Sequence, residues 1–476
     1  MRAHSLSAFA LTLAASALPA LAQSDGTPNA SRTPKAEAWP VPQDLTRNFT
    51  EDGAKSDWTF EWHGYVRMPV RVVDSPKGER EPYLVDDNYT ESGFAYLPVN
   101  ETEWAEMNLE ARFGESRFVA GLFAAQYSDW SEQPSKGHST PAYAFVEHTW
   151  RPDPVVVQMR AGMFWERMGY VDAYDTYVIG RTRQSGLQLD IKAFDLAYLR
   201  VGFGAHARTQ VRGHSPIGWA VLGADLGWLD VGLHAVHTWT NDDDDQFNES
   251  FRKGSMTVYG ADVMAAVPYV GPLHLAIGFY DADKIEFLSE SLEVLHSIGG
   301  NNLRQNFLGN QNEGTGEIQL SALELTWNVH RTVAAFAGEQ TARKFEGLDL
   351  KLFGMRAHVA TPHERSETAD EFKNDRVYFK WGTELFYQAL PTVLNQFYAA
   401  VRFDRVILDT DHEALSFRVW TPRLGVRPHK GMDVWLSYSN YSYGDLLQPR
   451  REVLNRVGED TRPDEHVFKL QAEMAW

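Results

Sequence analysis

Apolar and polar residues alternate along most of the chain between residues 58 and 476. The first such stretch covers residues 58–68. Its apolar set is Trp58, Phe60, Trp62, Val66 and Met68, and the intervening set is Thr59, Glu61, His63, Tyr65 and Arg67. Side chains at positions i and i+2 share a face only when the backbone is extended. The pattern therefore predicts a β-strand with one apolar and one polar face.

The same period of two recurs further along the chain. It is clearest over residues 106–113, and it returns in four later stretches. These are residues 155–163, 229–235, 273–279 and 397–403. Short turns join some strands, at residues 114–116 and 428–431. Longer polar segments join others, at residues 241–253, 297–315, 361–375 and 448–464. Short connections at one end and long ones at the other are typical of an outer-membrane β-barrel.

A soluble, secreted β-protein, such as a binding module or a glycosidase, would also show alternation, so the end of the chain is informative. From residue 466 to 476 the two faces again separate cleanly. Phe468, Leu470, Ala472, Met474 and Trp476 form one face, and Lys469, Gln471 and Glu473 form the other. The last residues of a soluble domain usually fray, whereas a final strand ending on an aromatic residue is characteristic of bacterial outer-membrane barrels. We therefore expect an all-β, transmembrane antiparallel barrel whose outer face contacts outer-membrane lipids.

The N-terminus indicates export from the cytoplasm. A short basic start is followed by an apolar run from Leu6 to Leu21 and by an Ala-Leu-Ala site that ends at Ala22. This layout is that of a secretory signal peptide, with an N-terminal membrane anchor as the alternative. Residues 23–57 are polar and predict a flexible periplasmic leader. The expected organisation is a signal peptide at 1–22, the leader at 23–57 and a porin barrel at 58–476.

Composition removes several other classes of protein. The 476-residue chain has no cysteine and a formal charge of −19, which argues against disulfide scaffolds, cysteine-based zinc sites and nucleic-acid binding. No H-E-x-x-H or phosphate-loop motif occurs, and Gly213–Gly218 resembles a nucleophile elbow with one residue too many. We expect no enzymatic activity, no cofactor and no metal site.

Five segments, in order along the chain, resemble maltoporin-type carbohydrate porins. Phe60–Arg67 is similar to the strand that opens those barrels, and Asp464–Trp476 to the strand that closes them. Glu101–Leu109 resembles an early strand, and Ala125–Trp130 a loop that crosses to a neighbouring subunit. Ala161–Leu187 resembles a strand followed by an inward-folded third loop. The resemblance implies a homotrimer of 18-stranded barrels that conducts sugars across the outer membrane.

The family's lumen has an aromatic slide flanked by polar tracks, and matching positions identify candidate substrate-binding residues. The slide candidates are Tyr65, Trp104 and Trp130, with Tyr259 and Tyr378 as further candidates from the middle of the chain. The polar-track candidates are Arg67, Glu106, Arg167 and Asp175, and Tyr177 is the candidate constriction aromatic. Aromatic rings can contact the apolar faces of sugars while charged groups hydrogen-bond their hydroxyls.

The resemblance is incomplete at the exit of the slide. Ala475 stands where the family has an aromatic residue, and an expected arginine falls near Tyr143 or Ala144. The sugar therefore stays undefined at this stage. A general or ion-selective diffusion porin without sugar specificity is the alternative function.

Overall fold

The computed structural model describes fourteen parts of the chain. They are residues 58–74, 104–125, 138–171, 173, 176–206, 216–240, 254–282, 316–360, 375–388, 396–407, 410, 416–429, 431–443 and 465–476. The predicted signal peptide and leader lie outside the described residues.

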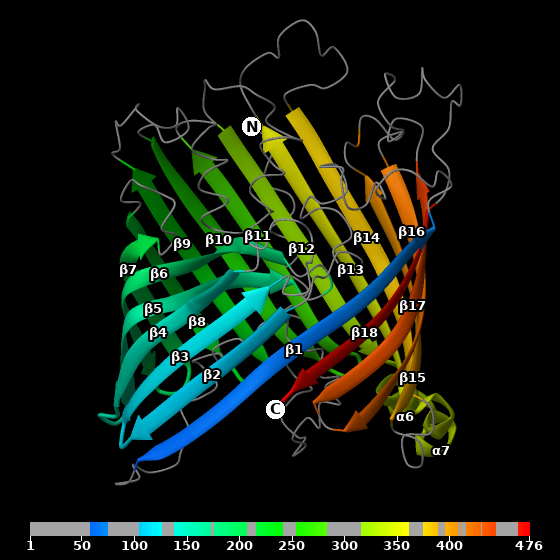
Figure 1. The fold of residues 1–476 in the computed structure, drawn as a ribbon, viewed down its shortest axis with the longest axis horizontal. Helices are drawn as coiled ribbons and strands as arrows, with labels where there is room; N and C mark the ends of the chain where they lie inside the picture. The colour runs from blue at the N-terminus through cyan, green and yellow to red at the C-terminus, as the bar shows by residue number, and fades with distance from the viewer. Residues whose placement is uncertain are drawn as a thin grey trace, which may run out of the picture.

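Within these ranges, eighteen antiparallel strands form one closed barrel (Figure 1). They are β1 (Thr59–Asp74), β2 (Trp104–Phe113), β3 (Ser116–Ala125), β4 (His138–Trp150), β5 (Val155–Val171), β6 (Thr176–Ala193), β7 (Ala197–His206), β8 (Pro216–Asp225), β9 (Leu229–Thr240), β10 (Gly254–Val267), β11 (Gly271–Ala282), β12 (Gly316–Asn328), β13 (Leu348–Ala360), β14 (Asp375–Gln388), β15 (Phe397–Ile407), β16 (Ser416–His429), β17 (Met432–Tyr443) and β18 (Glu465–Ala475). Each strand pairs with its neighbour in the chain, and β18 pairs with β1, so no sheet edge remains. The predicted fold class is confirmed.

The two ends of the barrel differ in how the strands are connected. At one end, which we call the turn end, connections are as short as Gly114–Glu115 between β2 and β3. At the other, the loop end, β1 and β2 are separated by residues 75–103, and β11 and β12 by residues 283–315. In outer-membrane barrels the short turns are periplasmic and the long loops extracellular. The turn end is therefore the periplasmic end.

The alternation along each strand separates an outer from an inner face. In β1, Phe60 and Trp62 are exposed on the outside, whereas Tyr65 and Arg67 are buried on the inside, as the sequence pattern predicts. Exposed outward aromatic side chains lie near both ends. Trp58, Phe113, Phe194 and Phe397 lie near the turn end, and Phe203, Phe279 and Trp420 near the loop end. Such bands are the aromatic girdles that sit at the two membrane–water interfaces.

The barrel closes where the first strand meets the last residue. The backbone N–H of Gly64 donates to the carbonyl of Trp476, and the N–H of Trp476 donates back to Gly64, each at 3.1 Å. Gly64 has no side chain, so the indole of Trp476 can lie directly over it; a β carbon there would be 2.8 Å from the ring atom Cε2. Trp62 meets the same indole edge-on, with ring centroids 6.2 Å apart. The predicted closing strand is present.

A short helical insertion connects β12 and β13 at the turn end. It comprises α6 (Val329–Ala337), α7 (Glu339–Ala342) and the 3₁₀ turn η5 (Arg343–Phe345). The Asn328 side chain caps α6 by accepting from the backbone N–H of Arg331 at 2.9 Å, which is the expected role of asparagine at that position. Among the described residues, no helix is both long and apolar enough to span a bilayer. The alternation pattern did not predict this insertion.

Candidate functional site

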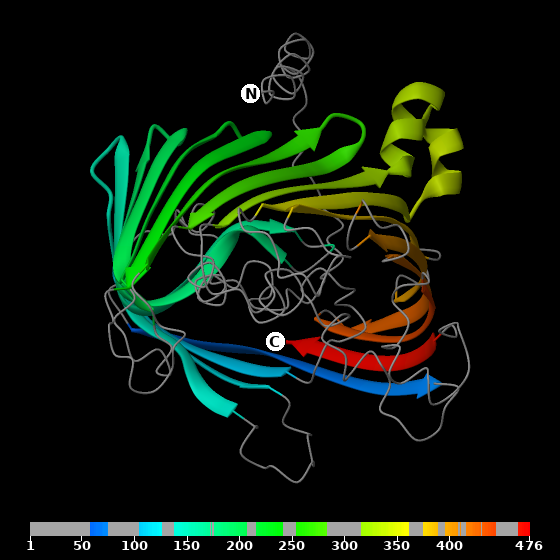
Figure 2. The same cartoon turned by 90° about the horizontal axis from the view of Figure 1, so that it is seen from above.

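One hairpin leaves the barrel wall and enters the interior. β5 pairs with β4 only as far as Met163, and β6 pairs with β7 only from Gln184 onward. Between these points β5 and β6 pair with each other alone and cross the interior (Figure 2). We call residues 164–184 the inner hairpin. It is the third loop-end connection, so the inward-folded loop implied by the family resemblance is found at its expected place.

The inner hairpin is buried on both faces. Consecutive residues such as Val178 and Ile179 are fully buried, and Trp165 and Glu166 are nearly so. The bend away from the wall occurs at Gly162, whose φ of 131° favours glycine. A β carbon there would also lie 2.8 Å from the α carbon of Phe145 on β4. A residue with a side chain would be excluded at this position on both grounds.

The hairpin rests on a pair of glycines in the opposite wall. Gly260 of β10 and Gly278 of β11 are paired across the two strands and face inward. A β carbon on Gly260 would lie 2.5 Å from a side-chain carbon of Ile179, and one on Gly278 would lie 2.6 Å from the carbonyl of Val178. We call this pair the glycine saddle. Beside it, the Tyr280 hydroxyl donates to the same Val178 carbonyl at 2.8 Å.

The tip of the hairpin is held by two charged side chains from distant strands. The backbone N–H of Ala173 donates to Glu324 Oε2 on β12 at 2.9 Å. Arg402 on β15 donates through Nη2 to the Ala173 carbonyl, also at 2.9 Å, and its guanidinium is paired with Asp404. Since the hairpin departs between β4 and β7, these contacts span the interior from one wall to the other. They fix the hairpin across the interior of the barrel.

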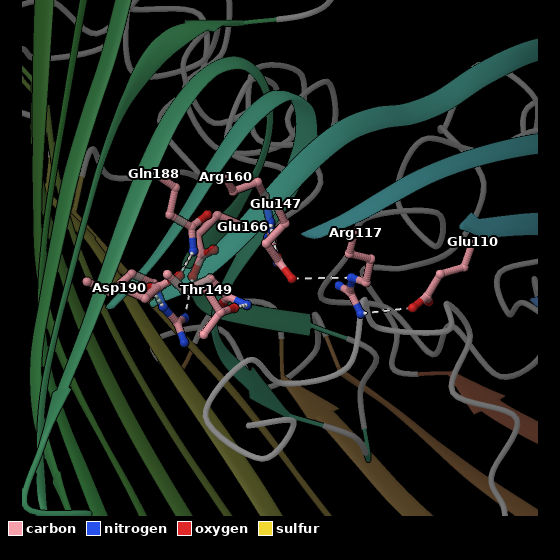
Figure 3. A network of polar contacts seen from close by, with 10 residues as sticks. Glu110, Arg117, Glu147, Thr149, Arg160, Glu166, Gln188 and Asp190 are labelled. Carbon is pink, nitrogen blue, oxygen red and sulfur yellow. Dashed lines mark hydrogen bonds and ion pairs between the residues drawn. The ribbon is translucent and has the colours of Figure 1, made fainter. Parts of the chain in front are cut away.

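A row of alternating charges runs along the inner wall from β2 to β7 (Figure 3). We call it the charged belt. Its members are Glu110, Arg117, Glu147, Arg160, Glu166, Asp190 and Arg200. Arg117 lies 3.6 Å from Glu110 and 3.2 Å from Glu147, and Glu147 accepts from Arg160 at 2.9 Å. Arg200 donates to Glu166 at 2.7 Å and to Asp190 at 2.8 Å.

The ion pairs of the belt are buried and not exposed on a solvated surface. Arg160 is 1 % exposed, and its guanidinium lies 4.5 Å from the ring centroid of Phe145. Charges at that depth are tolerated only when they are paired and hydrogen-bonded. Because Glu166 belongs to the inner hairpin and Arg200 to the wall, their ion pair ties the base of the hairpin to β7. The belt therefore positions the hairpin as well as lining the interior.

The inner wall changes chemistry along the barrel axis. In the loop-end half, inward side chains of β8–β13 and β15–β18 are mostly apolar and at most 4 % exposed, with Thr238 and Ser439 as polar exceptions. The apolar ones include Ile217, Trp219, Val236, Met256, Val258, Tyr280, Ile318, Leu320, Met355, Ala357, Val406, Phe417, Val419, Tyr441 and Val467. In the turn-end half the inward side chains are polar. They include Asp230, His234, Asp262, His274, Glu324, Lys351, Glu384, Arg423, Arg427 and Asp433.

Outside the charged belt, side chains of the turn-end half are more exposed to solvent than those of the loop-end half. The side chains of Asp262, Lys351 and Arg423 keep 17–23 % of their surface exposed. By contrast, Val258 and Ile318 in the loop-end half are fully buried. The apolar chemistry of the loop-end half is confined to β8–β13 and β15–β18, because Arg67, Glu106 and Lys380 are buried in the loop-end halves of β1, β2 and β14.

Three candidate residues lie together on the inner wall of β1 and β2. Tyr65 is opposite Glu106 in the strand register, and Arg67 is two residues further along β1. All three are buried. Tyr143 of β4, which the sequence reasoning did not select, donates from its hydroxyl to Glu106 at 3.1 Å and also to Asn108. Its inward orientation follows the alternation of β4, so the period-two pattern could have identified it.

The other candidates fall in different parts of the molecule. Tyr177 is buried in the inner hairpin, with its ring centroid 4.8 Å from that of Tyr170, a position that suits a constriction residue. Three further candidates lie in described strands, but their side chains are not described: Trp104 in β2, Arg167 in β5 and Tyr378 in β14. Trp130 and Asp175 lie outside the described residues.

The assignment of Tyr259 to the slide is wrong. Its neighbours Met256 and Val258 define the inner face of β10, and Tyr259 projects from the opposite face, where it is 59 % exposed. An outward tyrosine in a barrel strand belongs to the membrane-facing surface, and it has no access to the interior of the barrel.

Together these features define the class of the protein. A closed antiparallel barrel with an apolar outer face and aromatic girdles is stable only when lipid surrounds it, and such barrels belong to the bacterial outer membrane. The hairpin folded into the interior gives it a porin-like architecture. In the described part of the chain, no group of three or more histidine or acidic residues is arranged to hold a metal ion.

Comparison with known proteins identifies similar barrels but no family. No family model and no curated protein matches the chain. Among solved structures, Pseudomonas aeruginosa OccD3 (OpdP) is similar with a TM-score of 0.43 and 10 % identity, covering 89 % of this chain and 92 % of that one. OccK3 (OpdO) of the same organism gives 0.41 and 10 %, covering 88 % and 95 %. OmpT, an outer membrane protein of Vibrio cholerae, gives 0.42 and 10 %, covering 89 % and 100 %. Similarity at this level does not identify a solute.

Proposed function

We propose that this protein is a passive diffusion channel for small polar solutes, with a narrow passage at the inner hairpin. The observation that carries the proposal is the hairpin fixed across the interior, from the glycine saddle to Glu324 and Arg402. The turn-end half is a polar vestibule. In the loop-end half, the apolar inner face of β8–β13 and β15–β18 forms a barrier of the kind that limits permeation by excluding water.

Reconstitution into planar bilayers and liposomes tests this function. We expect a small ohmic conductance, and swelling of liposomes in monosaccharides or small amino acids that declines steeply for larger solutes. The heat-denatured protein is the matched control. Complete absence of conductance and swelling from a protein shown to be folded would contradict the channel, and equal permeation of small and large solutes would contradict the narrow passage.

Carbohydrate transport is the second candidate, and one local observation favours it. Tyr65, Tyr143, Arg67 and Glu106 bring two aromatic rings and two charges to one stretch of the inner wall. Such a combination suits the apolar faces and hydroxyl rims of sugars. Graded block of the ionic current by maltodextrins or sucrose, weakened in Trp104→Ala with conductance retained, supports this candidate. Unaltered current across a panel of sugars favours a general or ion-selective porin.

We further propose a homotrimeric assembly, which the family resemblance implied, embedded in outer-membrane lipids. Its support is the closed barrel with an exposed apolar outer face, which can contact both lipid and neighbouring copies. Light scattering of the detergent-solubilised protein, corrected for detergent, distinguishes a trimer from a monomer. We propose no enzymatic role.

A further inference from the structure

The helical insertion between β12 and β13 lies outside the perimeter of the barrel. Seen along the barrel, α6 and α7 project beyond the wall (Figure 2), and from the side they lie at the turn end (Figure 1). None of the residues of α6 is buried. Solute passage through the interior does not involve this element, so its exposed surface calls for a separate explanation.

The sequence of α6 separates an apolar stripe from a polar side. Val329, Val333 and Phe336 recur at the i, i+4 and i+7 spacing that places side chains on one face of a helix. Phe336 is 79 % exposed. Arg331 is exposed and falls on the opposite side of the helix by the same spacing. An apolar stripe of this kind does not remain in water without a covering partner.

The stripe continues the lipid-facing surface of the barrel. Phe336 meets Tyr269, at the turn between β10 and β11, edge-on with ring centroids 6.0 Å apart, and Tyr269 is itself 60 % exposed. Trp327, on the outer face of β12, donates from its indole to Thr332 Oγ1 at 2.6 Å, and Thr332 donates to the Tyr269 carbonyl at 2.6 Å. The helix is therefore fastened to the aromatic girdle at its turn-end border.

We propose that α6 is an interfacial anchor that lies on the phospholipid leaflet at the turn end, with Phe336 and Val333 inserted and Arg331 in water. The partner is lipid rather than protein because the stripe is continuous with the surface that the bilayer already covers. The cationic side chains Arg343 and Lys344, which follow α6 and α7, are exposed and suit phosphate headgroups. Aromatic and apolar residues facing a basic, polar side are the features of helices that bind in the membrane interface.

The absence of cysteine from the whole chain makes a direct test possible. Single-cysteine variants F336C, V333C, R331C and L352C are spin-labelled, and the full-length protein is folded into phosphatidylethanolamine/phosphatidylglycerol vesicles. Leu352 is an exposed outward residue of β13 and serves as the lipid reference; Arg331 serves as the water reference. Each variant is first shown to be folded by its heat-modifiable migration on a gel.

For each label we measure its accessibility to oxygen, which concentrates in lipid, and its accessibility to a water-soluble nickel complex. The readout is the first accessibility divided by the second. We expect the ratio at positions 336 and 333 to be several-fold above that at 331 and below that at 352. A ratio at 336 and 333 equal to that at 331 places the stripe in water and overturns the proposal. Labels at 336 and 333 that are immobile and protected from both reagents indicate a protein partner, which also overturns it.

Discussion

On β12, Ile318 and Leu320 are almost fully buried at the loop end, whereas Glu324, two inward positions further along, keeps 11 % of its side chain exposed at the turn end. The same strand thus supplies both halves of the interior with opposite chemistry. In the apolar half the hairpin and wall pack as in a protein core, and water is excluded. In the polar half, charges outside the belt, such as Asp262, Lys351 and Arg423, remain partly exposed to solvent. A single barrel can therefore combine a permeation barrier with a vestibule.

Placing one charge in each half should have the largest and most unequal effect. Ile318→Asp puts an unpaired carboxylate into the apolar half and should lower the free energy of unfolding by about 4 kcal/mol. Thr326→Asp puts the same group in the polar half of the same strand, at a half-buried inward position in register with Lys351, and should change it by less than about 1 kcal/mol. Urea unfolding in lipid vesicles measures both. Equal losses would show that the two halves do not differ as described.

Removing one member of the charged belt should have the next largest effect. Arg160→Met leaves Glu147 with Arg117 alone, and a buried charge that loses a partner costs about 3 kcal/mol. The matched control is Arg151→Met, which breaks a half-exposed pair with Glu115 at 3.3 Å and should cost less than about 1 kcal/mol. The same unfolding measurement applies. A loss at Arg160 no greater than at Arg151 would mean that the belt is dispensable.

Filling the glycine saddle should release the hairpin. Gly278→Val sets a side chain against the Val178 carbonyl. The resulting overpacking should destabilise the docked hairpin by about 2 kcal/mol and raise the fraction of molecules with an undocked hairpin more than tenfold. Single-channel conductance should rise accordingly. Gly354→Val is the control, because a β carbon at Gly354 meets nothing closer than 3.7 Å. Unchanged conductance in a folded Gly278→Val protein would show that docking of the hairpin does not limit permeation.

Loosening the hairpin tip should have the smallest effect. Glu324→Ala removes the acceptor for the Ala173 N–H, and the loss of this bond should cost about 1.5 kcal/mol and reduce hydrogen-exchange protection of that amide about tenfold. Glu324→Gln keeps an acceptor oxygen and should retain most of the protection. Equal exchange rates in both variants would indicate that the contact does not hold the tip.

Much of the outer surface and of the strand order could be predicted from the sequence, because contact with lipid places the same requirement on every strand. Every strand must present apolar side chains outward, and the faces of β1, β2 and β18 follow directly from their alternation. The inner face obeys no such single rule. In β10, Met256 and Val258 point inward beside an outward Tyr259, so both faces are apolar and periodicity alone cannot distinguish them. The wrong assignment of Tyr259 has this cause.

Other features depend on contacts that a local pattern does not contain. The saddle needs Gly260 and Gly278 to meet a hairpin about 100 residues earlier in the chain, as the pairing of Tyr280 with Val178 shows. The helix α6 did have a local signal: Asn328 as a capping residue, the spacing of Val329, Val333 and Phe336, and Gly338 after the last turn. The helical spacing covers only nine residues, and the period of two in the strands on either side outweighs it.

The contact between Gly64 and Trp476 also has a consequence for the order of folding. These residues are far apart in the chain, and no other pairing in the barrel joins segments so distant. Closing so long a loop has the greatest entropic cost of any strand pairing, so it is expected to come last, after the intervening hairpins have formed. Until then β1 and β18 each expose an unpaired edge that lipid cannot solvate. Both edges must therefore be shielded from lipid until β1 and β18 have paired.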